Sequence, residues 1–326
     1  MEPSNSTVPT TRVSTAQLAT ALLIVCGFSA GMWLAIEFAS STQPVKKAVS
    51  ASVLEALAAK DYFSNVEVFG SSAYVADIDT GAVLFKKNAD TQLPLASLTK
   101  VPLMLAVTEV LPLTSVISIP RDTSPTNAAD VLRAGSEWHV GDLIAYTLVG
   151  SSNDGAKILA HAADEGLRAK YPVAREGQAA VWRMNDIAKS LGLLHTYFLN
   201  PSGLDESETQ SGAYGSAADM AKLFGYAARQ PGDIFVGTSR LSVTITSTQG
   251  ERAVASNTDA ALDSIAGITM GKTGYTDLAG GNLVVVFTAG THRFVAVVLN
   301  STQAGRFADI RALVGATEEA ARKNNF

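Results

Sequence analysis

The chain has 326 residues, of which 47% are hydrophobic and 17% charged, and its formal net charge at pH 7 is −5. This composition supports a substantial core and argues against a disordered chain, and no basic block indicates nucleic-acid binding. The single cysteine, Cys26, excludes an intramolecular disulfide. We interpret it as a structural residue of an apolar segment, because Val25 is not the small residue that a lipoprotein site requires.

The N-terminal part of the chain contains a long uncharged segment. Residues 1–12 are polar and are predicted to be disordered, whereas residues 13–36 carry no charge. An apolar stretch of this length can cross a bilayer as a helix, so residues 13–40 are predicted to form a transmembrane anchor. A cleaved signal segment is the alternative, since small residues at its end could serve as a cleavage site. Residues 41–326 are then predicted to form the folded domain.

Strand and helix patterns follow one another along this domain. Ser72–Phe85 alternates between apolar and polar residues around a Thr80-Gly81 turn, which predicts a hairpin. The apolar run Lys100–Leu111 predicts a helix with Ser97 as its cap. Other helices are predicted at Ala48–Ala59, Val140–Val149, Ala156–Ala163, Ala179–Leu191, Ala217–Ala228 and Ala308–Arg322, and strands at Leu241–Thr246, Asn282–Thr288 and Phe294–Leu299.

The order of strands, helices, strands and a last helix indicates an α+β fold, because a regular alternation of strands and helices is missing. The strands from the two ends of the domain can pair into one antiparallel sheet flanked by helices. The helical middle would then form a second lobe.

The first chemical motif is Ser97-Leu98-Thr99-Lys100. A serine hydroxyl is a poor nucleophile until a neighbouring base takes its proton, and residues three apart share a helix face. Lys100 is therefore predicted to hold its amine beside the Ser97 hydroxyl. The free N–H groups at the start of a helix would suit a developing oxyanion. Alone, the motif is also compatible with a capping serine and a surface lysine.

The second motif is Ser151-Ser152-Asn153, between two helical patterns. A hydroxyl and an amide two residues apart could relay a proton and bind a substrate amide. The same stretch could equally be a polar turn between helices.

The third motif is Lys272-Thr273-Gly274. A lysine and a threonine on an edge strand can bind a carboxylate, while the glycine allows a substrate backbone to approach and add to the edge. A phosphate-binding loop also ends in Gly-Lys-Thr, but its first glycine would have to stand where Ala266 does. The following sequence is strand-like where that loop requires a helix.

S-x-x-K, S-x-N and K-T-G, in this order, are the motifs of penicillin-binding proteins and serine β-lactamases. The stretches AYVADIDTGAVLFKKNADTQLPLASLTK, RMNDIAKSLGLLHTYFLNPSGLD and KTGYTDLAGGNLV also resemble the D-alanyl-D-alanine carboxypeptidases, which are low-molecular-mass penicillin-binding proteins. The resemblance covers roughly residues 70–300. It implies a β-lactamase/transpeptidase-like fold and a hydrolase that removes the terminal D-Ala of peptidoglycan stem peptides and is inhibited by penicillin.

The resemblance also implies roles for individual residues. Ser97 would form the acyl-enzyme, with Lys100 as its general base. Ser151 and Asn153 would assist proton transfer and hold the substrate. The remaining implied roles are binding of the terminal carboxylate by Lys272 and Thr273, close approach of substrate at Gly274, and an oxyanion hole from the N–H groups of Ser97 and Tyr275.

Other functions of the same fold stay open at this point. In class A β-lactamases a glutamate in an E-x-x-L-N stretch hydrolyses the acyl-enzyme, but the nearest match here begins with Thr196. This predicts slow deacylation and hence a penicillin target. A β-lactam sensor or inactive binding domain, an endopeptidase and an esterase are the other candidates.

No cofactor and no metal site are expected, because His139, His161, His195 and His292 show no metal-ligand spacing. The expected partners are the stem peptide, β-lactams as covalent inhibitors and the membrane, and no nucleic acid is expected. Arg12 before the apolar segment and Lys46-Lys47 after it would place the domain in the cytoplasm by charge alone. Since peptidoglycan lies outside the membrane, we expect a cell-membrane protein with an extracytoplasmic catalytic domain.

Overall fold

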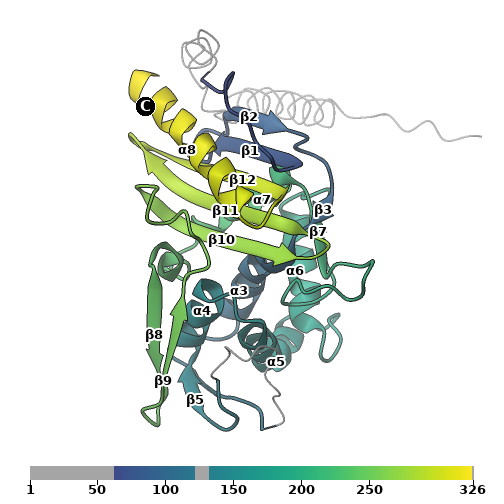
Figure 1. Ribbon diagram of the computed structural model, residues 1–326. Helices are drawn as coiled ribbons and strands as arrows, with labels where there is room; N and C mark the ends of the chain where they lie inside the picture. Colours follow the sequence, from purple (N-terminus) through teal and green to yellow (C-terminus); the bar gives the residue numbers. More distant parts are fainter. Residues whose placement is uncertain (1–61, 122–131, 325–326) are drawn as a thin grey trace, which may run out of the picture. The chain divides into compact units, whose positions relative to one another are not determined.

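The computed structural model describes residues 62–121 and 132–324 (Figure 1). A five-stranded antiparallel sheet with the order β10-β11-β12-β1-β2 joins strands from both ends of the described chain. The predicted pairing of the early hairpin with the late strands is therefore confirmed. The strands are β1 (Ser72–Asp77), β2 (Val83–Lys87), β10 (Ile268–Thr276), β11 (Gly280–Ala289) and β12 (His292–Ser301).

Helices cover both faces of this sheet, and Figure 1 shows α8 lying across β11 and β12. On the other face, α7 packs against β1 and β12, and the remaining helices form a separate lobe. The helices are α3 (Lys100–Thr108), α4 (Val140–Val149), α5 (Asn153–Lys170), α6 (Ala179–Ser190), α7 (Ala217–Ala227) and α8 (Gly305–Asn324), with 3₁₀ turns η1 (Ala96–Thr99) and η2 (Val236–Ser239).

The two covered faces explain why β11 is apolar almost without interruption. Leu283, Val285 and Phe287 belong to the cluster that packs against α8. The alternate residues Val284 and Val286 belong to the larger cluster on the helical side. A strand that is buried on both faces loses the polar half of the usual alternation.

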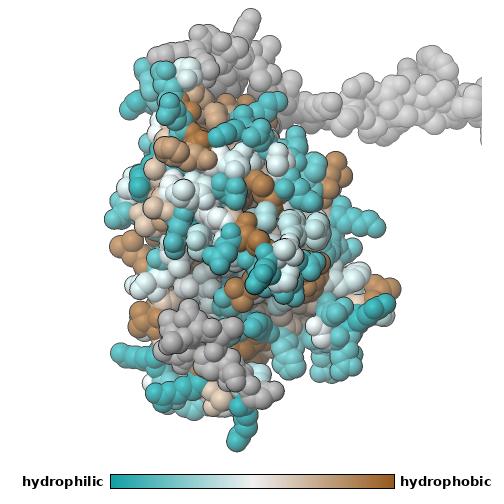
Figure 2. All heavy atoms as spheres, turned by 45° about the vertical axis from the view of Figure 1, so that its right-hand side comes forward, coloured by the Kyte–Doolittle hydropathy of each residue, from teal (hydrophilic) through white to brown (hydrophobic). Residues whose placement is uncertain are grey.

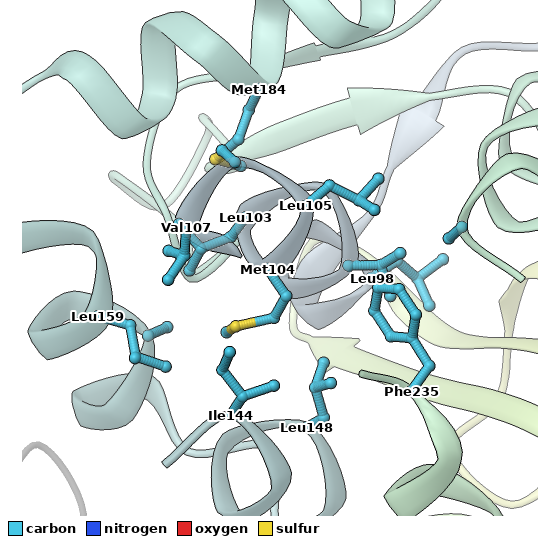
Figure 3. Close-up of a cluster of buried hydrophobic side chains, with 14 of the residues drawn as sticks. Leu98, Leu103, Met104, Leu105, Val107, Ile144, Leu148, Leu159, Met184 and Phe235 are labelled. Atoms are coloured by element: carbon cyan, nitrogen blue, oxygen red, sulfur yellow. The ribbon is translucent and has the colours of Figure 1, made fainter. Parts of the chain in front are cut away.

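Helix α3 lies at the centre of the helical lobe, and all its residues from Lys100 to Val107 are buried. Figure 3 shows Met104 pointing toward Ile144 of α4 and Leu159 of α5. A helix that is apolar all round is a core helix. The residues at its N-terminal end are consequently held on a rigid support.

The start of α3 differs from the prediction in one respect. Ser97 does not cap the helix, because it lies inside the 3₁₀ turn η1 and the cap position is Thr99, which makes no side-chain capping hydrogen bond. The hydroxyl of Ser97 is thereby left for another partner.

Four short strand pairings complete the fold. The predicted strand at Leu241–Thr246 is present as β8, but it pairs only with β9, which was not predicted, and stays outside the main sheet. The pairs are β8 (Ser242–Thr246) with β9 (Arg252–Ser256), β4 (Val116–Ser118) with β5 (Glu137–His139), and β7 (Ala213–Gly215) with both β3 (Leu93–Pro94) and β6 (Tyr197–Phe198).

The predicted disordered N-terminus (1–12), the anchor or signal segment (13–40) and the helix at Ala48–Ala59 lie outside the described residues. Among the helices within 62–121 and 132–324, none combines the length and apolar character needed to span a bilayer. On the face in Figure 2, hydrophobic residues lie in small groups among hydrophilic ones.

Candidate active site

The turn that carries Ser97 lies between β3 and α3. Ala96 has φ +48°, in the left-handed region that a residue with a Cβ rarely adopts, so this turn is strained. Leu98, Thr99 and Lys100 are buried, whereas Ser97 is only half-buried. The turn therefore presents one hydroxyl at the surface of an otherwise packed segment.

The amine of Lys100 lies directly beside that hydroxyl. The side chain is fully buried, and its Nζ donates to Ser97 Oγ over 2.7 Å, to Asn153 Oδ1 over 2.8 Å and to the Ser202 carbonyl over 3.0 Å. An ammonium has three N–H donors, so these three acceptors fix its orientation. The contact that the three-residue spacing predicts is present, and a deprotonated amine at this position could accept the serine proton.

The stretch Ser151-Ser152-Asn153 is both a turn and part of the site. Ser152 caps α5, because its Oγ accepts from the Gly155 N–H over 2.9 Å. Ser151 has φ +58°, and its Oγ accepts a hydrogen bond from Lys272 Nζ. Asn153 Oδ1 accepts one from Lys100 Nζ. The middle residue thus holds the turn, and the two outer residues each contact one of the two site lysines.

Lys272 lies on β10, the edge strand of the main sheet, as the sequence predicts. It is 1% exposed, and its Nζ donates to Ser151 Oγ over 2.9 Å and to the Thr273 carbonyl over 3.0 Å. The Thr273 hydroxyl shares a hydrogen bond with that of Thr258. Tyr275, the next residue but one, is 44% exposed.

Gly274 allows β10 to lie close to the 3₁₀ turn Ala96–Thr99, which carries Ser97. A Cβ at this position would lie 2.7 Å from the Leu95 carbonyl oxygen and 3.3 Å from the Ser97 nitrogen, which is too close for a side chain. The glycine of the third motif is therefore required by a backbone approach. This approach brings the segment of β10 that carries Lys272 and Thr273 beside the turn that carries Ser97.

Burial gives Lys272 an unusual electrostatic state. Removal from water and, to a smaller extent, the positive charge of Arg306 lower the pKa of Lys272, Asp259 opposes both, and the resulting pKa is about 7. An anion that binds beside Lys272 would favour its charged form. The site is thus suited to capture a carboxylate at neutral pH.

A loop that contains Asn200, Ser202 and Gly203 packs against the turn that carries Ser97 and against Lys100. No role was predicted for this loop from the sequence. Asn200 Oδ1 accepts from the N–H groups of Ser202 and Gly203, which holds the loop while the Ser202 carbonyl faces Lys100. Gly203 has φ +79°, and a Cβ there would lie 1.9 Å from the Ala96 carbonyl oxygen. The Asn-Pro-Ser-Gly sequence signals a turn, but no local pattern reveals that the turn contacts Lys100.

Two further side chains hold the strands around the site. Asn282 of β11 donates to the Pro94 carbonyl over 2.9 Å, and Arg306 of α8 donates to the Gly274 carbonyl over 2.7 Å. Both stabilise the segments beside Ser97 through backbone groups. Their roles depend on long-range contacts and could not be predicted from spacing.

Thr196 occupies the position that matches the β-lactamase glutamate in the sequence. Its hydroxyl donates to Asp219 Oδ2 over 2.8 Å, and Asp219 lies in the first turn of α7. Among the described residues no group of three or more His, Cys, Asp or Glu side chains could hold a metal ion. Of the histidines, His292 contacts Asp77 over 2.6 Å.

A cavity of about 400 Å³ lies between β1 and α7 and does not reach the residues of the three motifs. Its lining includes Tyr74, Asp219 and Lys222 but none of the three motifs. The convergent side chains of Ser97, Lys100 and their partners, rather than this cavity, carry groups that can perform acyl transfer.

Comparison with known proteins agrees with this geometry. Residues 56–303 match the S11 peptidase family, described as D-alanyl-D-alanine carboxypeptidase. The chain is 32% identical over 228 residues to the D-alanyl-D-alanine carboxypeptidase DacB2 of Mycobacterium tuberculosis, covering 69% of this chain and 72% of that protein. It is 28% identical over 237 residues to DacF of Bacillus subtilis, covering 71% of this chain but only 57% of that relative.

A solved structure shows the same fold. Penicillin-binding protein D2 of Listeria monocytogenes, in its ampicillin-bound form, superposes with a TM-score of 0.65 at 27% identity, covering 77% of this chain and 98% of that one. The predicted transpeptidase-like α+β fold is thereby confirmed.

Proposed function

Because this chain belongs to the D-alanyl-D-alanine carboxypeptidase family of S11 peptidases, we propose that it is a serine-type D-Ala-D-Ala carboxypeptidase. It would remove the terminal D-Ala of peptidoglycan stem peptides through an acyl-enzyme on Ser97. The observation that carries the proposal is the 2.7 Å contact between Lys100 Nζ, at the start of the buried helix α3, and Ser97 Oγ in the 3₁₀ turn before it. A nucleophile and a base in hydrogen-bond contact are the minimum for covalent acyl transfer.

In the acylation step, Lys100 in its neutral form takes the Ser97 proton while Ser97 Oγ attacks the carbonyl carbon of the D-Ala–D-Ala bond. The backbone N–H groups of Ser97 and Tyr275 stabilise the oxyanion. The tetrahedral intermediate then expels the amine of D-alanine, which receives a proton through Ser151, Asn153 and the adjacent lysines. Water hydrolyses the ester and restores the serine hydroxyl.

Substrate binding uses the edge strand. The stem peptide would add to the free edge of β10, with its backbone close to Gly274. The terminal carboxylate would bind Lys272 and the Thr273 hydroxyl. Since burial already lowers the pKa of Lys272 to about 7, carboxylate binding would stabilise its charged form.

Penicillins would acylate the same serine. Because Thr196 stands at the position of the β-lactamase glutamate and is bonded to Asp219, we expect no activated water from that side. The penicilloyl ester would persist, so the protein is proposed as a penicillin target and not a β-lactamase.

The test uses a fluorescent penicillin and the full chain. Wild type should be labelled covalently, Ser97→Ala should not, and Ser190→Ala, which changes an exposed serine at the end of α6, should label like wild type. Labelling that persists in Ser97→Ala would overturn the assignment of the nucleophile.

The products that the wild-type protein releases distinguish the alternative functions. Release of D-alanine from a pentapeptide stem identifies a carboxypeptidase, whereas cleavage of cross-linked dimers without such release identifies an endopeptidase. Rapid loss of the label identifies a β-lactamase. Stable labelling with no peptide turnover identifies a sensor or an inactive binding domain.

Residues 13–40 are proposed to anchor the protein in the cell membrane, with the catalytic domain outside the cytoplasm. The apolar length of the segment supports an anchor, and the location of peptidoglycan supports the outward orientation. Protease treatment of intact cells lacking a wall should digest the domain. Complete protection would contradict the orientation.

A further inference from the structure

Two glycines from distant parts of the chain approach the turn that carries Ser97. A Cβ on Gly203 would lie 1.9 Å from the Ala96 carbonyl oxygen. A Cβ on Gly274 would lie 3.3 Å from the Ala96 Cβ and 3.3 Å from the Ser97 nitrogen. Gly203 belongs to loop 199–212, which connects β6 to β7, and Gly274 belongs to β10. The loop and the strand are therefore both in direct contact with the turn.

A carboxylate joins the loop to the strand. Asp205 is half-buried and lies two positions after Gly203. Its Oδ1 accepts from the Thr276 hydroxyl over 2.9 Å, and its Oδ2 accepts from the Leu278 N–H over 3.4 Å. Thr276 is the last residue of β10, two positions after Gly274, and Leu278 lies in the turn to β11. Asp205 thus ties together the two segments that contact the Ser97 turn.

Loop 199–212 is braced by its own hydrogen bonds. Asn200 Oδ1 accepts from the N–H groups of Ser202 and Gly203 over 3.1 and 2.7 Å. Asn200 Nδ2 donates to the Leu204 carbonyl over 2.8 Å, and its backbone N–H donates to the Gly212 carbonyl over 3.3 Å. Satisfied backbone groups hold a loop in one conformation. The tie to β10 therefore starts from a segment of defined geometry.

The residue between the held positions of β10 is Tyr275, whose N–H is one of the two proposed oxyanion donors. The peptide that joins Gly274 to Tyr275 is trans, so its C=O and N–H point in opposite directions. Arg306 donates to the Gly274 carbonyl over 2.7 Å and so sets the orientation of that N–H. Asp205 holds the next residue, Thr276, and so limits how far the peptide can move from the Ser97 turn.

We propose that Asp205 is a positioning residue for the reaction: it fixes the Tyr275 N–H at the distance from the Ser97 N–H that an oxyanion hole requires. Two donors stabilise one oxyanion only when both lie within hydrogen-bond distance of it. Asp205 acts through Thr276 and Leu278, which lie at the end of β10 and in the turn after it. The inference rests on the proposed function and concerns its oxyanion hole.

The experiment compares four variants of the full chain with wild type. Asp205→Ala removes both acceptors, and Thr276→Val removes the hydroxyl but keeps the shape of the side chain. Asp205→Asn keeps one oxygen that can accept from Thr276. Glu208→Ala is the control, because Glu208 is an exposed acid of the same loop. Thermal unfolding checks that each variant is folded, and Asp205→Asn replaces Asp205→Ala if the latter does not fold.

Two measurements separate positioning from a general loss of structure. Stopped-flow kinetics with a penicillin give the first-order acylation rate constant and the dissociation constant of the complex that precedes it. Infrared difference spectra of the acyl-enzyme, made with a penicillin that is isotope-labelled at its reactive carbonyl, give the stretching frequency of the ester. Hydrogen bonds in the oxyanion hole lower that frequency, so it reports directly on the two N–H donors.

Asp205→Ala and Thr276→Val should each slow acylation about ten-fold and leave the dissociation constant near the wild-type value, because a displaced donor costs less than a deleted one. Their ester bands should move to higher frequency. Asp205→Asn should lie between Asp205→Ala and wild type, and Glu208→Ala should follow wild type. The double variant should be no slower than Asp205→Ala, since both changes remove the same contact.

An ester band at the wild-type frequency in Asp205→Ala, or a loss confined to the dissociation constant, would overturn the role of Asp205. Equal slowing in Glu208→Ala would overturn it too, since that result would assign the effect to the charge of the loop. A wild type that neither binds penicillin at Ser97 nor releases D-alanine would instead overturn the proposed function, and this inference with it.

Discussion

The two ends of helix α3 hold an ionisable side chain in different surroundings: Glu109 at one end is half-buried, and Lys100 at the other is fully buried. At the C-terminal end, Glu109 accepts hydrogen bonds from Lys170, Tyr171 and Arg183, so cations surround the anion. At the N-terminal end, the amine of Lys100 donates to a hydroxyl, an amide and a carbonyl oxygen, none of which is an anion. The same helix therefore carries an anion among cations at one end and, at the other, the amine that we propose as the general base.

The Glu109 cluster at the C-terminal end of α3 contributes to the stability of the fold. Burial alone would raise the pKa of Glu109, but the hydrogen bonds from Arg183, Tyr171 and Lys170 lower it overall. The cluster joins α3 to α5 and α6, and so fixes the helix on which Ser97 and Lys100 depend. Functional sites commonly hold polar groups that the fold does not fully compensate, and the surrounding structure stabilises them.

The largest effect should come from replacing the reactive amine. Lys100→Met keeps an unbranched side chain but removes the base, so acylation by penicillin should fall by about 10³-fold. Stopped-flow or gel measurement of labelling rates tests this, with thermal unfolding as the check on folding. A labelling rate within about ten-fold of wild type would contradict the role of Lys100 as general base. The two ends of α3 would then not differ in function.

A glycine contact supports the N-terminal end. Gly203→Ala would place a Cβ 1.9 Å from the Ala96 carbonyl oxygen, at φ +79°, so unfolding free energy should fall by about 3 kcal/mol and acylation should slow. Gly250→Ala is the matched control, since Gly250 has φ +88° but no atom within 4 Å of its Cβ position. The unfolding free energy of Gly250→Ala should fall by only about 1 kcal/mol, and its acylation rate should equal that of wild type. Equal losses in the two variants would show that backbone strain alone matters.

The second site lysine sets a pH limit. Because the pKa of Lys272 is about 7 in the free protein, kcat/KM for a D-Ala-D-Ala peptide should fall about ten-fold for each pH unit above that value. Lys272 is charged below this pKa and neutral above it, so the loss occurs on the alkaline side. Measurement of kcat/KM against pH tests this, and a flat profile from neutral to alkaline pH would contradict it.

The smallest expected effect lies at the C-terminal end of α3. Glu109→Gln removes the anion from among its cations and should lower the unfolding free energy by about 2 kcal/mol at neutral pH, with penicillin labelling retained. Glu318→Gln, at an exposed glutamate of α8, is the control. Denaturant titration measures both variants.

The pH dependence of that loss follows from the lowered pKa of Glu109 in the fold. A carboxylate with a depressed folded pKa stabilises the protein above its ordinary, unfolded pKa, and this contribution disappears as pH falls through the folded value. The difference between Glu109→Gln and wild type should therefore shrink in acid. A difference that stays constant there would show that the ion pairs are not its source.

Much of the fold could be predicted because its signals are local. Helix α4 has the predicted bounds, and the β1–β2 hairpin follows from alternation around a turn. The strand β9 was missed, since Arg252–Ser256 is short and its buried alternate residues are alanines, while the larger apolar Val254 is exposed. The capping role given to Ser97 was wrong, because a 3₁₀ turn precedes α3 and local spacing does not distinguish it from a helix start.

The sequence by itself indicated which groups could perform the proposed chemistry. Ser97 and Lys100 are close because they lie three positions apart along a helical backbone, and the two other motifs are recognisable from residue types alone. Local geometry suffices where the chain is short between partners.

Only the tertiary structure decided how the lysines are held and tuned. Asn200 holds a loop whose Ser202 carbonyl accepts from Lys100, about 100 residues away in the chain. Burial, Arg306 and Asp259 together set the pKa of Lys272. Burial and electrostatic fields depend on what packs around a group in space, and no spacing in the sequence specifies that.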